Sequence, residues 1–265
     1  IGPEAAPAVP MLRGLLANER AQTKAVQAVW EVEGGADQVL PDVIFLDLNM
    51  PLFNGKDFAN WKLPAGDNGH WKIIDGVIDY DAESEAEKDK NLWTTKTYKD
   101  FVLYVDWRIK ETPWKNPNVP IILPSGLHKR NEKGEAMTML VPDSDSGILL
   151  RGVGKCQANI WNWPIGSGEV YGYRMDEKMP PEVRRGVTPK VNADKNIGEW
   201  NTFKITMKGD RMSVELNGIM VIENALLPGI PLEAPIGFHH HGSKKNAQWN
   251  SPPSLVQFTN VYIKE

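Results

Sequence analysis

Short alternations of apolar and polar residues dominate this chain from about residue 51 to the C-terminus. Alternate side chains of a β-strand point to opposite faces, so a period of two predicts strands with one buried face. The pairs Asn54-Gly55, Asp75-Gly76 and Asn217-Gly218 lie between such segments and favour the tight turns of hairpins. Many short strands joined by tight turns predict an all-β antiparallel sandwich.

The first 50 residues follow another pattern. Apolar residues recur at helical spacing, and Gly34-Gly35 is a plausible end for the second run. This region is expected to be a helical lead segment, compatible with a fragment of a helical-repeat module. The predicted domains are therefore residues 1–50 and 51–265. The apolar residues concerned are Met11, Leu12, Leu15, Leu16, Val26, Val29 and Trp30.

Residues 146–174 combine this alternation with side chains that can hold a sugar. In CQANIW, Cys156, Ala158 and Ile160 alternate with polar or aromatic residues, so one face is expected to be core. The GEVYGYR segment is expected to be a further strand. The opposite face then offers a guanidinium, carboxamides and aromatic rings, which predicts a polyol-binding surface. Its members are Arg151, Gln157, Asn159, Trp161, Trp163, Glu169, Tyr171 and Tyr173.

Composition narrows the classes of function. A net charge of −4, from 30 basic and 34 acidic residues, gives no basic footprint for nucleic acid. The single cysteine, Cys156, cannot form an intrachain disulfide and is expected to be buried and inert. No apolar run approaches the length of about 18 residues that a membrane-spanning helix needs. The chain opens with neither a start methionine nor a signal peptide, so a trimmed chain is expected.

The segment GFHHHG, residues 237–242, concentrates three of the five histidines. Alternation places His239 and His241 on one face of a strand and His240 on the other. Two histidines at positions i and i+2 can ligate a divalent metal together with a carboxylate, or one can act as a general base. A purely structural role is the remaining alternative.

Three groups of carboxylates are further candidates. Residues 79–85 carry acidic side chains at alternate positions, which could flank a glycosidic bond, but the intervening residues favour a solvated loop over 81–91. Asp106 shares the polar face of FVLYVDWRIK with Arg108, as an ion pair or as part of a cleft. The DSDSG segment at 143–147 could bind calcium, although a turn into the next strand is favoured.

Seven segments, taken in order and spacing, resemble the 3-keto-disaccharide hydrolase family over about residues 51–265. The resemblance implies a concanavalin/laminarinase-like jelly-roll β-sandwich, and an exported bacterial protein that is secreted or periplasmic. The segments are LFNGKDFANW, WKIIDGVIDYD, LWTTKTYKDFVLYVDWR, DSDSGILLRG, GSGEVYGYR, GEWNTFKITMKGDRMSVELNG and VQFTNVYIKE.

The activity that this resemblance implies is cleavage of glycosides oxidised at C3. The ketone acidifies the C2 proton, a base removes it, the enolate expels the C1 substituent, and water then adds. By the resemblance, His241 is the base or a metal ligand, with Asp106 and Glu169 as catalytic partners. Arg151 matches a family arginine and would place a substrate oxygen.

The resemblance also distinguishes the residues that would bind the substrate from the residues that would react with it. Gln157 stands where many relatives carry glutamate, and His239 stands where glutamine is usual, so the stretch from Gln157 to Tyr171 is expected mainly to hold an oligosaccharide or glycoside substrate. A non-catalytic carbohydrate-binding module remains an alternative, because lectin-like folds use the same surface without chemistry. A laminarinase-like hydrolase with two facing carboxylates is the third possibility.

Overall fold

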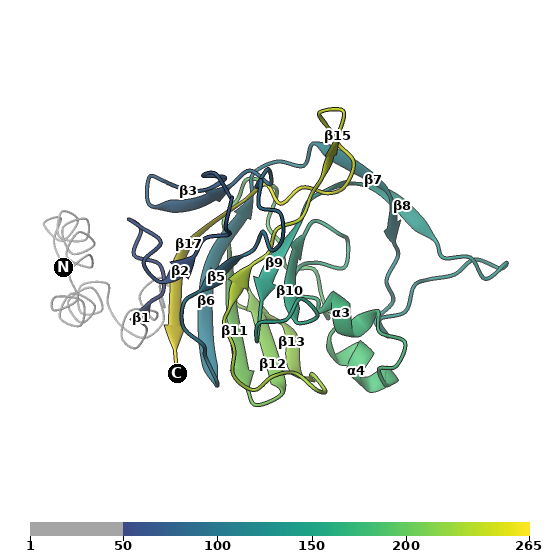
Figure 1. The fold of residues 1–265 in the computed structure, drawn as a ribbon. Coiled ribbons are helices and arrows are strands. Elements are labelled where there is room, and N and C mark those ends of the chain that lie inside the picture. The colour runs from purple at the N-terminus through teal and green to yellow at the C-terminus, as the bar shows by residue number, and fades with distance from the viewer. Residues whose placement is uncertain (1–49) are drawn as a thin grey trace, which may run out of the picture. The chain divides into compact units, whose positions relative to one another are not determined.

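The structure is a computed structural model, and it describes residues 50–265 (Figure 1). The predicted helical lead segment and the boundary that follows it fall on residues outside this range, apart from Met50. Two antiparallel sheets contain most of the strand residues of the described chain. The larger contains, in spatial order, β13 (Ile219–Leu226), β12 (Arg211–Leu216), β11 (Asn201–Lys208), β6 (Phe101–Ile109), β17 (Val256–Lys264), β4 (Val77–Tyr80) and β3 (Trp71–Ile74), with β1 (Met50–Pro51) paired to β17.

The smaller sheet and the segments that follow its strands carry most of the predicted site residues. It is five-stranded, and apart from the consecutive β9 (Asp145–Leu149) and β10 (Gln157–Trp161) its neighbouring strands come from distant parts of the sequence. The remaining elements lie outside the two sheets. In order across the smaller sheet the strands are β10, β9, β14 (Gly237–Phe238), β5 (Leu92–Thr94) and β2 (Trp61–Lys62). The other elements are the hairpins β7 (Trp114–Pro120) with β8 (Thr138–Asp143) and β15 (Lys244–Lys245) with β16 (Gln248–Trp249), and the helices α3 (Tyr171–Arg174) and α4 (Pro181–Gly186).

The two sheets bury one hydrophobic core between them. In β6, burial alternates at every residue, with Leu103 and Val105 fully buried. In β10, Ala158 and Ile160 are fully buried and belong to the same cluster as the β6 residues. Each sheet therefore turns one face inward, as the period of two predicts. The prediction of an all-β sandwich is confirmed, with few helices.

Two of the three predicted hairpin turns form, whereas Asn54-Gly55 lies between β1 and β2, which belong to different sheets and make no hairpin. Asp75 and Gly76 join β3 to β4 with φ angles of 50° and 77°, and Asn217 and Gly218 join β12 to β13 with φ angles of 53° and 80°. Asn, Asp and Gly tolerate this left-handed region, which gives hairpin turns the twist that the flanking strands need. These turns fix the register of both hairpins.

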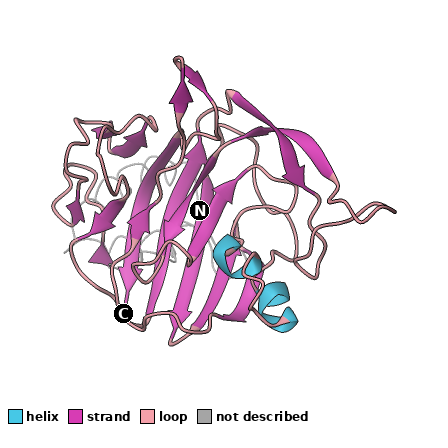
Figure 2. Ribbon diagram, turned by 45° about the vertical axis from the view of Figure 1, so that its right-hand side comes forward, coloured by secondary structure: helices cyan, strands magenta, loops and turns pink. Residues whose placement is uncertain are grey.

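The GEVYGYR segment departs from the predicted strand. After β10, Gly166 and Gly168 adopt φ angles of 90° and 99°, which turn the chain away from the sheet. The chain then forms α3, whose Tyr173 is buried while Tyr171 stays 42% exposed. Glu169, Tyr171 and Tyr173 therefore do not share one strand face. Figure 2 shows the two helices together at one side of the strands.

Three further expectations concern the loop at residues 81–91, the single cysteine and membrane-spanning helices. Residues 81–91 form no helix and no strand, as predicted, and Cys156 is fully buried. Burial raises the pKa of the Cys156 thiol, in keeping with an inert side chain. Within residues 50–265 there is no helix with the length and apolar character that crossing a membrane requires.

Candidate active site

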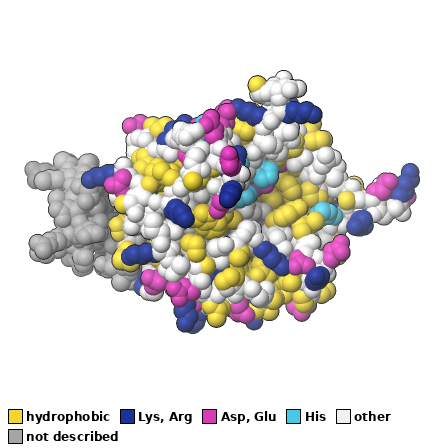
Figure 3. Space-filling view, in the orientation of Figure 1, with side chains coloured by type: hydrophobic (Ala, Val, Ile, Leu, Met, Phe, Trp, Pro, Cys, Tyr) yellow, Lys and Arg dark blue, Asp and Glu magenta, His cyan; other side chains and the backbone are white. Residues whose placement is uncertain are grey.

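A cavity of about 390 Å³ lies on the smaller sheet, on the face opposite the core. Because Ala158 and Ile160 of β10 face the core, Gln157, Asn159 and Trp161 face the cavity. Figure 3 shows histidine side chains at the surface beside a group of hydrophobic side chains. The cavity brings together seven of the predicted site residues and adds an aspartate. Its lining consists of Asp145, Gly154, Gln157, Asn159, Trp161, Trp163, Tyr171, Gly172, His239, His241 and Pro252.

His241 has one ring nitrogen fixed and the other available. Nδ1 lies 2.6 Å from the carbonyl oxygen of Pro252, so Nδ1 carries the proton and donates it to this acceptor. The backbone N–H of His241 donates to Ser254 Oγ at 2.8 Å, which holds this segment in place. Nε2 is then an unprotonated acceptor that lies 3.8 Å from Asp145 Oδ2. This geometry suits a general base with a carboxylate beside it.

Asp145 is a functional candidate that the sequence did not assign to the active site, since its DSDSG segment suggested a turn or a calcium site. Its side chain is 24% exposed, and its Oδ1 atom is buried without a hydrogen-bond partner among the described residues. Burial raises the pKa of Asp145, the positive charge of protonated His241 would lower it, and the nearby carboxyl of Asp143 raises it again. A carboxyl with a raised pKa beside a histidine is typical of catalytic sites.

The neighbouring histidines have different environments. His239 lines the cavity, and burial lowers its pKa to about 3, so its imidazole is neutral near pH 7. The His239 backbone N–H donates to the carbonyl of Gly147 at 2.9 Å. His240 points the other way, with Nδ1 2.6 Å from the Tyr80 hydroxyl, and burial lowers its pKa to about 4.

The predicted metal site lacks a ligand set. The rings of His239 and His241 lie 6.0 Å apart. In the part of the chain that the structure describes, no group of three or more His, Cys, Asp or Glu side chains is arranged to hold a metal ion. The two histidines do not fit a divalent metal by themselves, since a protein site normally supplies at least three ligands.

An aromatic wall, formed by Trp161, Trp163 and Tyr171, borders the cavity. The two indole rings stack at 4.0 Å with an interplanar angle of 5°, and Tyr171 meets Trp161 edge-on at 6.2 Å. Trp161 Nε1 donates to the carbonyl of Gly166 at 2.8 Å, and Trp163 Nε1 donates to Asp143 Oδ1 at 3.0 Å. Both indoles are therefore fixed before a ligand arrives, which lowers the entropic cost of binding.

The carboxamide side chains of Gln157 and Asn159 complete the floor of the cavity. Gln157 Nε2 donates to the carbonyl of Ser146 at 2.8 Å, and a side chain at Gly147 would collide with Gln157, since a Cβ there would lie 2.5 Å from its Cγ. Asn159 is buried, with 3% of its surface exposed, and it lines the cavity. Its side chain makes no hydrogen bond within residues 50–265. Its amide is therefore available to a ligand oxygen.

Glu169 does not line the cavity, contrary to its predicted place on the sugar-binding face. It is fully buried and accepts a hydrogen bond from Arg174 Nε. Burial raises its pKa to about 7, although the charge of Arg174 acts in the opposite direction. The Arg174 guanidinium lies 5.4 Å from the centre of the Tyr171 ring, so the cation of this ion pair packs against one ring of the aromatic wall. Its position supports a structural rather than a catalytic role.

Arg151 also departs from its predicted place on the cavity face. It adopts a φ of 58°, so the chain turns after β9 and carries the side chain into the protein, where it is fully buried. Its guanidinium donates to the carbonyl oxygens of Tyr98 at 2.9 Å, Gly209 at 3.2 Å and Leu232. The residue joins three loops, and its side chain does not reach the cavity.

Asp106 lies on the other sheet. In β6 it alternates with the buried Val105 and Trp107, so it points away from the core and from the smaller sheet. It accepts hydrogen bonds from Thr202 Oγ1 at 2.6 Å and from Asn260 Nδ2 at 2.7 Å. Period-two alternation predicts its polar face correctly, but this face is not the one that carries His241.

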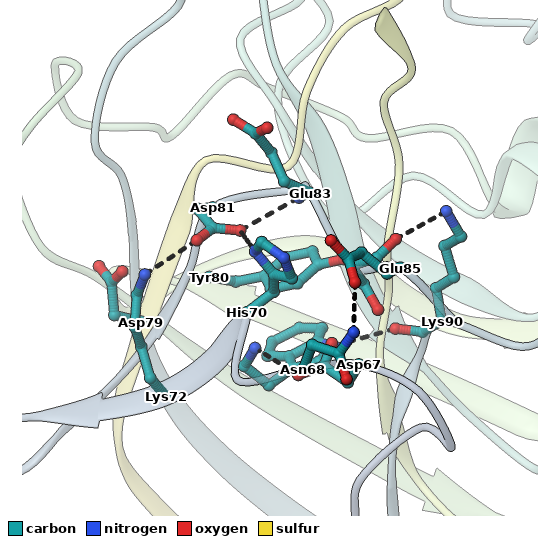
Figure 4. A network of polar contacts seen from close by, with 12 residues as sticks. Asp67, Asn68, His70, Lys72, Asp79, Tyr80, Asp81, Glu83, Glu85 and Lys90 are labelled. Atoms are coloured by element: carbon teal, nitrogen blue, oxygen red, sulfur yellow. Dashed lines mark hydrogen bonds and ion pairs between the residues drawn. The ribbon is translucent and has the colours of Figure 1, made fainter. Parts of the chain in front are cut away.

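The alternating carboxylates of residues 79–85 take part in polar contacts away from the candidate cavity, and none of them lines it (Figure 4). Asp79 forms an ion pair with Lys110, whose Nζ lies 2.9 Å from Asp79 Oδ1. Asp81 pairs with Lys72 at 2.8 Å and with His70 at 2.9 Å. Only Asp79 belongs to a strand, so these residues do not form the facing pair that an ordinary glycosidase requires.

Comparison with known proteins places this chain in a family. The family model described as the 3-keto-alpha-glucoside-1,2-lyase-like domain matches residues 49–264. Two crystal structures from Parabacteroides distasonis, of proteins provisionally named as glycosyl hydrolases, share the fold. One is 20% identical, with 83% of this chain and 84% of that chain covered and a TM-score of 0.51. The other is 19% identical, with 86% and 99% covered and a TM-score of 0.50. No curated protein matches by sequence. The chain therefore belongs to the 3-keto-alpha-glucoside-1,2-lyase-like domain family.

Proposed function

We propose that this protein cleaves the glycosidic bond of 3-keto-glucosides, with His241 as the base. The family assignment supports a carbohydrate-active function. The observation that carries the finer proposal is the free Nε2 atom of His241, 3.8 Å from Asp145 and at the edge of a cavity walled by fixed aromatic rings. A sugar ring on the aromatic wall would bring its C–H bonds toward this nitrogen.

The reaction divides into elimination and hydration. His241 Nε2 takes the C2 proton, and the C–H electron pair forms the C2–C3 double bond of an enolate whose charge lies on the C3 oxygen. The enolate then expels the C1 substituent: the C1–O bond breaks, its electron pair goes to the leaving oxygen, and water on the open side supplies the proton. Water adds to the resulting enone, with hydroxyl to C1 and a proton to C2. Asp145 stabilises the imidazolium that forms in the first step.

The remaining cavity residues fit the other requirements of this reaction. The negative charge that develops on the C3 oxygen needs hydrogen-bond donors in place before the reaction begins. The Asn159 amide is not hydrogen-bonded within the described chain, and neutral His239 has an N–H to donate. We assign these two residues to the enolate oxygen, and Trp161 and Trp163 to the apolar face of the sugar.

The test compares a 3-keto-glucoside with the same glucoside before oxidation. Mass spectrometry should show free aglycone from the keto sugar alone, and a reaction in D₂O should place deuterium at C2 of the released sugar faster than a control without enzyme. Binding without release of aglycone would indicate the alternative, a non-catalytic carbohydrate-binding module. Release from the unoxidised glucoside would indicate an ordinary hydrolase instead.

A further inference from the structure

A second and larger cavity, of about 970 Å³, lies on the same sheet near β5 and β2. It shares no lining residue with the candidate active site. Trp93 of β5 lines it, together with residues of the neighbouring loops. The polar side chains at its border include Asn68, Glu85, Asn91, Thr95, Thr97 and Lys62.

Strand pairing places the two cavities on one face of the smaller sheet. One row of register partners runs across the sheet, from Gln157 to Leu149, then to Gly237, Trp93 and Lys62. Residues in register share a face, so Gln157 on the floor of the active-site cavity and Trp93 of the larger cavity lie on the same face of the sheet, with the buried Leu149 and Gly237 between them. Three strand spacings separate Gln157 from Trp93, a distance of about 14 Å. A ligand longer than a single sugar ring has the length to reach from one cavity to the other.

Trp93 is a preorganised platform. A Cβ at Gly237 would lie 2.6 Å from Trp93 Cε3, so the absence of a side chain at Gly237 allows the indole to lie against the sheet. Trp93 Nε1 donates to Asp89 Oδ2 at 2.6 Å, and Asp89 Oδ1 accepts from the Asn91 amide at 2.7 Å. Trp93 is partly exposed and lines the cavity, so part of its apolar ring is open to a ligand.

The polar groups beside Trp93 suit hydroxyl groups better than ions. Lys62 and Lys88 line the cavity together with Glu85, Glu87 and Asp89, so charges of both signs are present. Uncharged amides and hydroxyls lie between them. An indole beside mixed hydrogen-bonding groups is the arrangement that binds a polyol with one apolar face.

We propose that the Trp93 cavity is a second carbohydrate-binding subsite, which holds the part of an oligosaccharide ligand that extends beyond the ring in the active-site cavity. The occupant is a neutral gluco-oligosaccharide. The subsite rests on the proposed function only in its placement relative to the cleaved bond, while the binding itself needs no catalysis.

The test measures binding of unoxidised sugars by isothermal titration calorimetry. Maltohexaose, isomaltohexaose and cellohexaose are each compared with the disaccharide of the same linkage. The chain should bind at least one hexasaccharide at least about tenfold more tightly than its disaccharide, and Trp93→Ala should remove that difference. Trp200→Ala is the matched control, since Trp200 packs against Arg108 of β6, on the other sheet.

The outcomes separate the subsite from the proposed function. Equal affinities for long and short sugars in every pair, or a length effect that survives in Trp93→Ala, would overturn the subsite. If Trp93→Ala does not fold by circular dichroism, Trp93→Phe decides, because it shortens the platform and loses the bond to Asp89. A length effect lost with Trp93, in a protein that releases no aglycone from 3-keto-glucosides, supports the subsite and contradicts the proposed cleavage.

Discussion

His241 Nε2 lies 3.8 Å from Asp145 Oδ2, while His241 Nδ1 donates to the carbonyl of Pro252. The carbonyl contact sets the tautomer, and the carboxylate faces the nitrogen that remains free. The pair combines a base with a negative charge that stabilises its protonated form, which is the arrangement a proton abstraction requires.

Asp145→Asn should lower kcat/KM by about 100-fold or more, because the imidazolium formed by His241 loses its carboxylate partner. Burial raises the pKa of Asp145, so its negative charge is lost as pH falls through that raised value. Wild-type kcat/KM should therefore decline on the acid side, and this contribution to the decline should be missing from Asp145→Asn. Asp210→Asn, at an exposed hairpin position, is the control. Identical pH profiles for wild type and Asp145→Asn would remove Asp145 from the mechanism.

Glu169 should affect stability more than chemistry. Glu169→Ala leaves the Arg174 charge buried without its partner, which should lower the free energy of unfolding by about 3–5 kcal/mol in urea titrations. Glu223→Ala, which breaks an exposed pair with Lys190, should change little. Equal effects of the two substitutions would contradict the structural role of the Glu169 pair.

The Glu169 carboxyl also makes the free energy of unfolding depend on pH. Its pKa is about 7 in the folded protein and about 4.3 in an unfolded chain, so the folded state binds the proton more tightly. The contribution of the protonated Glu169 carboxyl to the free energy of unfolding is fully present below the pKa of the unfolded chain. It is lost as pH rises through about 7. Glu169→Gln should flatten this part of the curve of unfolding free energy against pH, and an unchanged curve would show that Glu169 does not titrate in this range.

Arg151 and Asp106 should not contribute to substrate recognition. Arg151→Met should lower the melting temperature, because three loop carbonyls lose their donor, while KM of the folded fraction stays within about twofold. Asp106→Asn should leave kcat/KM unchanged, since Asp106 points away from the smaller sheet. A large rise in KM for Arg151→Met, or a large loss of kcat for Asp106→Asn, would restore the roles that the sequence suggests.

Local pattern predicts much of the fold. Alternation identifies the buried faces of β6 and β10, and the Asp75-Gly76 and Asn217-Gly218 turns lie where their residue types require. Alternation also places His239 and His241 together on the cavity face, because this needs only neighbouring residues.

The errors arise where long-range strand pairing or an irregular turn decides the position of a side chain. Asp145 of β9 reaches the cavity because it pairs in register with Trp161 of the adjacent strand β10. No local pattern in the sequence reveals this pairing. Asp106 has the predicted face but belongs to the other sheet, since a period of two does not tell one sheet from another. Arg151 and Glu169 leave the predicted face because of local turns, at Arg151 itself and at Gly168.

The rate of aglycone release from a 3-keto-glucoside by His241→Ala tests the central claim most directly. We expect wild type to release aglycone and His241→Ala to lose at least about 100-fold in kcat with an unchanged circular dichroism spectrum. His70→Ala, which removes a histidine outside the cavity, should keep wild-type activity. Release by His241→Ala at the wild-type rate would contradict the assignment of His241 as the base.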